Sequence, residues 1–104
     1  MIVTSTPSVE GKSINQYLGI VVGETIVATS IFRDVMAGLR DLVGGRSGAY
    51  EEKMREARAL ALKEMTEEAE KLGANAVVGI RFATADVVPG AAEMIAYGTA
   101  VVIE

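Results

Sequence analysis

The sequence predicts one domain of the α+β class, spanning residues 1–104. Residues 75–86 and 92–103 alternate with the two-residue period of strands, and the turn residues between them predict a hairpin. Residues 50–72 instead follow the period of a helix, and residues 14–30 are rich in β-branched side chains that favour extended chain. Extended chain, then helices, then a hairpin is the element order of an α+β domain.

The first extended segment, residues 14–30, alternates around apolar β-branched residues. Gly19 and Gly23 interrupt this pattern, either as bulges or as a turn near Glu24. The segment therefore predicts one long strand or two shorter ones.

A short amphipathic helix is predicted over residues 31–43, where apolar side chains recur every three or four positions. Ser30 is placed to cap its start, and Gly44 and Gly45 end it. The long helix over residues 50–72 follows, with Gly73 placed as its left-handed C-cap. The apolar side of the long helix consists of Met54, Ala57, Ala61, Met65, Ala69 and Leu72.

The two C-terminal strands are joined by a turn at Val88-Pro89-Gly90. In the first strand, one face is expected to carry Ala76, Val78, Ile80 and Phe82. Neither face of the second strand is polar, so we expect something to cover the side of the sheet that the helices leave open. In a chain this short, that cover is expected to be another copy of the chain. Gly79 and Gly98 lie inside these strands and predict either a bulge or a close approach of another backbone.

Composition excludes several classes of function. The chain has no cysteine and no histidine, which excludes disulfides, thiolate metal sites and cysteine nucleophiles. Its net charge of −4 argues against a nucleic-acid partner or an anionic membrane surface. The start of the chain lacks the charged and apolar regions of a signal peptide, and no apolar run is long enough for a membrane helix. A cytoplasmic location is expected.

A glycine-rich loop leads directly into the long helix and is the strongest candidate for a ligand site. Loop amides and the first N–H groups of a helix bind anions, and Arg46 could add a bidentate contact. The alternative is a connector that lets two helices reverse direction, with Ser47 as N-cap and Arg46 paired to a carboxylate. The loop reads Gly44-Gly45-Arg46-Ser47-Gly48-Ala49-Tyr50-Glu51, which is neither a phosphate-transfer loop nor a dinucleotide-binding turn.

Charged pairs Arg33-Asp34 and Arg40-Asp41 lie two turns apart on the predicted short helix. Such a ladder forms ion pairs within or between subunits. The catalytic alternative is an enzyme that uses Arg46, Tyr50 and Asp34 for acid and base chemistry. No residue set has the spacing of a metal site, and no cofactor is predicted. Carboxylates that a hard cation could use are Glu24, Asp34, Asp41, Asp86 and Glu93.

In residues 31–34, 38–51 and 72–80 the chain closely resembles the YbjQ-like family of small bacterial and archaeal proteins. Thr6-Pro7, Glu10-Gly11 and residues 98–101 match the family pattern as well. The resemblance implies a dodecin-subunit-like β-α-β-β arrangement, with an antiparallel sheet packed on a long helix. It also implies assembly into a ring, expected to be a homopentamer. The family carries the label of a heavy-metal-binding domain, and its biochemical role is not established.

The sequence therefore favours a ring-forming, homo-oligomeric binding or scaffold module that is not an enzyme and holds a small anion or metal near the glycine-rich loop. The alternatives are metal binding or storage, as the family label suggests, and the enzyme described above. The residues that we expect to bind a ligand, or to join subunits, are Arg33, Asp34, Gly45, Arg46, Ser47, Tyr50 and Glu51.

Overall fold

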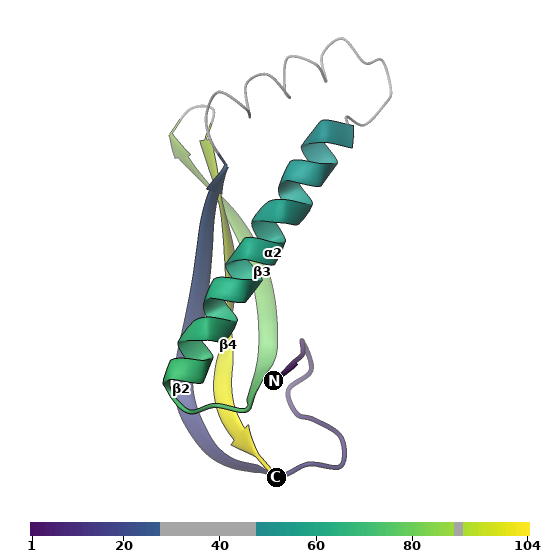
Figure 1. The fold of residues 1–104 in the computed structure, drawn as a ribbon, viewed down its shortest axis with the longest axis vertical. Helices are drawn as coiled ribbons and strands as arrows, with labels where there is room; N and C mark the ends of the chain where they lie inside the picture. Colours follow the sequence, from purple (N-terminus) through teal and green to yellow (C-terminus); the bar gives the residue numbers. More distant parts are fainter. Residues whose placement is uncertain (28–47, 89–90) are drawn as a thin grey trace.

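The computed structural model describes residues 1–27, 48–88 and 91–104 and shows a four-stranded sheet with one long helix across it (Figure 1). The elements are β1 (Ile2–Val3), β2 (Ile14–Val27), α2 (Gly48–Lys71), β3 (Ala76–Val88) and β4 (Ala91–Ile103). The predicted α+β class is confirmed, and the main elements follow the expected β-α-β-β order. The predicted helix over residues 31–43 lies outside the described residues.

The strands lie in the order β1-β3-β4-β2, so β4 is central and β2 forms one edge. β4 pairs antiparallel with both neighbours, which makes β2 and β3 run in the same direction. The sheet is mixed and not purely antiparallel, because β1 adds a parallel pair beside β3. No pattern in the sequence predicts this two-residue strand. β2 is one continuous strand, without a turn at Glu24.

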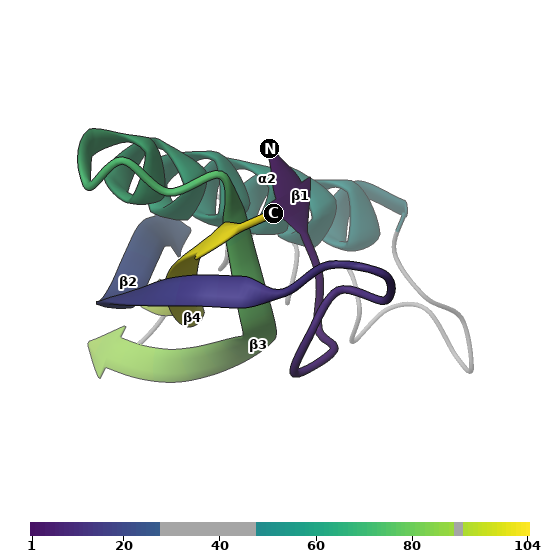
Figure 2. The ribbon, with the colours of Figure 1, turned by 90° about the horizontal axis from the view of Figure 1, so that it is seen from below.

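Helix α2 covers a single face of the sheet (Figure 2). Its buried side is made of small residues and one long flexible one, with Ala57, Ala61, Met65 and Ala69 all at most 3% exposed. Small side chains let the helix approach the strands closely, and a thin core results. The side chains that it meets on the sheet are Val21, Val27, Val77, Ile80, Met94, Ala96 and Ala100.

A bulge at Gly79 changes which face the β3 side chains occupy. The pairing of β3 with β4 shifts register between Val78 and Arg81, and Gly79 has a φ of 63°, which favours glycine. Val78 therefore packs on the face away from the helix, whereas Ile80 packs under it. The expectation that Ala76, Val78, Ile80 and Phe82 share one face was wrong, because a bulge adds one residue to the alternation.

The face of the sheet away from α2 is covered at one end by the chain itself. There Val9 of the N-terminal loop and Ile14 pack on a small cluster formed by Ala76, Val78, Val101 and Ile103. The expected cover is therefore in part this N-terminal segment. Farther along the same face, no described residue provides a second layer.

Helix α2 ends at Lys71, and Gly73 adopts the left-handed conformation with a φ of 88°. The N–H of Gly73 donates to the Glu70 carbonyl at 3.0 Å and that of Ala74 donates to Ala69 at 3.1 Å. These bonds satisfy carbonyls that the helix end would leave unpaired, so the predicted C-cap is confirmed. No helix in the described part of the chain is long and apolar enough to cross a membrane.

Candidate functional site

The most unusual feature of the described surface is a row of large apolar side chains on the uncovered face of the sheet. We call it the open face, formed by Tyr17, Ile20, Val22, Ile26 and Tyr97. Ile20 is 77% exposed, Tyr17 70% and Ile26 61%. Val22 pairs directly with Tyr97, so their side chains stand together on this face. Isolated exposed apolar residues are ordinary, but a contiguous group indicates an interaction surface.

The position of α2 decides which face stays open. Residues 21, 23, 25 and 27 of β2 point to the helix, and residues 20, 22, 24 and 26 therefore point away from it. Both sets are mainly apolar, so alternation alone does not distinguish them. Gly23 is the signal in the sequence that could have identified the covered face, since a missing side chain permits the helix to lie on the strand.

A groove runs along the outer side of β2, where α2 overhangs the strand. Two adjoining hollows of about 180 Å³ and 380 Å³ form it, and Thr25 and Leu60 line both. We call this the edge groove. Leu60 is 54% exposed there, although it lies in the middle of the helix. Charged side chains border the groove, among them Lys53, Lys63, Glu56, Glu64 and Glu67.

Two carboxyl groups meet on the open face. Glu24 of β2 and Glu93 of β4 lie diagonally across adjacent strands, since Glu24 pairs with Ile95 and Ile26 with Glu93. A hydrogen bond with Glu93 and the charge of that carboxylate raise the pKa of Glu24 above its usual 4.5. Weaker contributions to the raised pKa come from desolvation and from the charge of Glu64. Glu24 therefore holds its proton more tightly than an isolated glutamate does.

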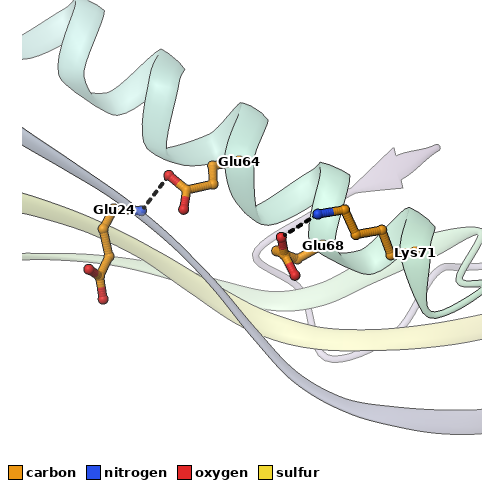
Figure 3. Close-up of polar contacts among 4 residues, drawn as sticks. All are labelled: Glu24, Glu64, Glu68 and Lys71. Atoms are coloured by element: carbon orange, nitrogen blue, oxygen red, sulfur yellow. Dashed lines mark hydrogen bonds and ion pairs between the residues drawn. The ribbon is translucent and has the colours of Figure 1, made fainter.

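Glu64 of α2 makes a different contact with the same strand (Figure 3). The backbone N–H of Glu24 donates to its Oε2 at 3.4 Å, while the Glu24 side chain points away from the helix. This N–H is thus directed at the outer edge of β2 and not at β4. In the same figure, Glu68 accepts a 3.0 Å bond from Lys71 and raises the pKa of that ammonium group. Both residues are largely exposed, so this pair is a surface contact of small energetic value.

The residues that the sequence singled out as ligand-binding are mostly outside the described part. Arg33, Asp34, Gly45, Arg46 and Ser47 all fall there, and of Tyr50 only the backbone is described, in the first turn of α2. Glu51 also lies in that turn and forms an ion pair with Arg55, with 3.9 Å between Oε2 and Nη2. The helix begins at Gly48, inside the segment predicted as the glycine-rich loop, so that Gly48 to Glu51 form its first turn. Whether these residues bind an anion or join subunits stays a prediction.

The described residues do not fit a heavy-metal site. Within residues 1–27, 48–88 and 91–104 there is no group of three or more histidine, cysteine, aspartate or glutamate residues that could hold an ion. Heavy metals prefer thiolate and imidazole ligands, and the chain has no cysteine or histidine anywhere. The remaining soft donors are the thioethers of five methionines, of which Met65 and Met94 are buried in the core.

The geometry defines a class of protein: a small α+β domain whose sheet is covered by a helix on one side and exposes apolar residues on the other. A family model described as "Putative heavy-metal-binding", named YbjQ, matches residues 1–104. The chain belongs to this family, and the expected resemblance is confirmed.

A solved structure has the same fold. It is a protein of unknown function from Pediococcus pentosaceus, assigned to the DUF74 family. The two chains are 15% identical with a TM-score of 0.55, and the match covers 100% of this chain and 98% of the other. At this identity the likeness shows the fold alone.

Proposed function

We propose that this protein is the subunit of a homo-oligomeric binding or scaffold module and is not itself an enzyme. The observation that carries this proposal is the open face, whose three most exposed side chains all belong to β2. Burying a side chain of this size stabilises an assembly by about 1.5–3 kcal/mol. Covering several of them together supplies a substantial driving force for association.

The shape of the chain supports the same proposal. The Cα radius of gyration is 16.6 Å, whereas a compact domain of this length has one of about 13 Å. The largest fully buried side chains are Met65, Val77 and Val101, and most of the other core residues are alanine or valine. A thin, elongated subunit with a small core gains stability when a neighbouring copy buries part of its surface.

A second copy of the chain is the partner that we favour, because most oligomers of soluble proteins are symmetric assemblies of one chain. Membership of the family supports a ring, and five subunits is the number that we propose. The glycine-rich loop remains the candidate for a bound anion. Its helix N-terminus supports this part of the proposal, although Gly44, Gly45, Arg46 and Ser47 lie outside the described residues.

Native mass spectrometry and light scattering at micromolar concentration test the proposal. The unmodified chain is expected to give one discrete oligomer, and the variant Ile20→Asp is expected to give mainly single chains. A charge at this position opposes burial of the open face without removing any core contact. The control is Ala59→Asp, at an exposed position on α2, which is expected to leave the oligomer intact. A single chain in the unmodified protein would exclude the proposal.

A further inference from the structure

We infer that neighbouring copies join by strand addition: the free edge of β3 in one copy pairs in parallel with the free edge of β2 in the next, and Phe82 enters the edge groove. This inference rests on the proposed self-association and specifies its geometry. It follows from three matches between the two edges of the same chain, in backbone groups, in shape and in charge.

Both edges of the sheet present backbone groups with which no described strand pairs, although the outward N–H of Glu24 donates to Glu64 Oε2 of α2. β2 forms one edge over its whole length, Ile14–Val27. On the other side, the N-terminal segment covers β3 only as far as Ile80, whose N–H donates to the Thr4 carbonyl at 3.1 Å. Beyond Ile80, β3 has no partner on its outer side among the described residues. Unpaired edges of this length are templates for adding another strand.

The alternation of the two edges fits parallel pairing. On β2, Glu24 directs its N–H outward, so Val22 and Ile26 do the same, and their side chains lie on the open face. On β3, Ile80 directs both backbone groups outward, since its N–H bonds Thr4 and its carbonyl accepts from Arg81 Nη1. Phe82 and Thr84 follow the same alternation, but their side chains lie on the helix side.

This difference between the edges selects the direction. In a parallel ladder, the residues that exchange hydrogen bonds carry their side chains on opposite faces, whereas in an antiparallel ladder they share a face. Pairing β2 with the β3 of a neighbour therefore keeps both helices on one side of a continuous sheet only if the strands are parallel. β2 and β3 already run in the same direction within one chain, so a simple rotation about the strand direction relates the copies. Such a contact joins two different surfaces, and it forms a ring when the rotation between copies closes.

Side chains at the two edges are complementary in shape. Phe82 is 46% exposed on the helix side of β3, where α2 does not reach. When β3 of the neighbour is added level with β2, its Phe82 stands beside the edge groove, where Leu60 is exposed. An aromatic side chain that packs on the apolar part of a groove, here Leu60, is typical of the residues that dominate interface energies, and charged side chains border the rest of this groove.

The charges are complementary as well. Arg81 pairs with Tyr97, which pairs in turn with Val22, so Arg81 lies on the open face at the β3 edge, where its Nη1 donates to the Ser5 carbonyl at 2.9 Å and the Ile80 carbonyl at 2.7 Å. In the added strand it would face β2 close to Glu24, and Glu93 would lie one strand farther away, on β4. A guanidinium group there offsets the repulsion that raises the pKa of Glu24.

Engineered cysteines test this pairing directly, because the chain has none of its own. Each of three double variants carries Val22→Cys on β2 and one cysteine on the same face of β3. The second substitution is Arg81→Cys, Ala83→Cys or Ala85→Cys, so that the three variants test three possible alignments of the two strands. Oxidation links them as a disulfide, which needs Cα atoms about 4.4–6.8 Å apart. Within one chain β4 separates the two positions, so the link forms only between adjacent copies. One double variant is expected to give a ladder of covalent dimers, trimers and larger species on denaturing gels.

The controls separate this inference from the proposed function. The single variants Val22→Cys and Ala83→Cys, and the double variant Val22→Cys with Thr84→Cys on the opposite face, are expected to stay monomeric on the gel. Dimers from Val22→Cys alone, with no larger species, would show that β2 pairs with itself in an antiparallel dimer. An intact oligomer by native mass spectrometry with no ladder from any double variant would overturn strand addition and leave the proposed function standing. A single chain in the mass spectrum would overturn both.

Discussion

Gly23 of β2 lies directly against Ala61 of α2, so that a Cβ atom built on the glycine would overlap the Ala61 carbonyl oxygen. The same atom would be 2.6 Å from the backbone nitrogen of Met65. The neighbours here are helix backbone, which cannot move aside as a flexible side chain does. This contact fixes how closely the helix lies on the strand, and through it which face of the sheet is covered.

The substitution Gly23→Ala is expected to destabilise the fold by about 3 kcal/mol, because the helix must move away from the strand. Denaturant unfolding of the purified protein measures the change. The control is Thr25→Ala, on the same face two residues farther along, which removes atoms and is expected to cost less than about 1 kcal/mol. Equal stability of Gly23→Ala and the unmodified protein would mean that the close contact of helix and strand is absent.

Asn75 bridges the start of β3 and the end of β4 through its side chain. Its Nδ2 donates to the Ile103 carbonyl at 2.8 Å, and its Oδ1 accepts from the Ile103 N–H at 2.7 Å. Asn75→Ala is expected to lose both bonds and about 2 kcal/mol of stability. Asn75→Asp keeps only the acceptor, so its stability is expected to lie between those of the unmodified protein and Asn75→Ala. Asn15→Ala, at an exposed position on β2, is the control and should change the unfolding midpoint little.

Glu24→Gln is expected to stabilise the single chain at neutral pH. The pKa of Glu24 is raised above 4.5 in the folded chain, so losing the proton costs more there than in the unfolded chain. Stability is therefore lost as the pH rises through the raised pKa, and a glutamine avoids this loss. Below pH 4.5, where the acid is protonated in both states, the advantage of glutamine should vanish.

Thermal unfolding between pH 4 and 7.5 checks this prediction, in the Ile20→Asp background that keeps the chain single. Residue 20 is four positions from Glu24, about 13 Å along a strand, so the new charge is largely screened. Glu10→Gln, in the N-terminal loop, gives the background effect of removing a carboxylate. In the assembled protein, Arg81 of the neighbour is expected to reduce the advantage of glutamine. If Glu24→Gln instead became more stable than the unmodified residue as the pH falls, a raised pKa of Glu24 would be contradicted.

Heavy-metal ions are expected to leave the folded protein unaffected. Elemental analysis after dialysis should find far less than one metal ion per chain, because thiolate and imidazole ligands are missing. Addition of Zn²⁺ or Cu²⁺ at low micromolar concentration should leave the unfolding temperature unchanged, and chelator treatment should do so too. One ion per chain that survives dialysis and raises the unfolding temperature would contradict this prediction.

Local patterns determined much of the fold. The helical period of residues 50–72 and the C-cap at Gly73 placed α2 to within two residues of its observed start, and alternation placed β3 and β4. These features depend on contacts between residues close in the chain, which composition and spacing describe well. The candidate site was harder to predict. The glycine-rich loop has the composition of a ligand site, whereas the apolar residues of β2 are typical of any strand.

The sequence by itself determined the long helix, the three long strands, the order of these elements, and the absence of thiolate and imidazole chemistry. Only the tertiary structure decided that β2 is an edge strand, that Gly79 shifts β3 by one residue, and that Val9 and Ile14 cover one end of the second face. Strand order and the choice of face depend on contacts between residues distant in the chain. An apolar strand pairs and packs equally well on either side until the helix, seated on Gly23, occupies one of them.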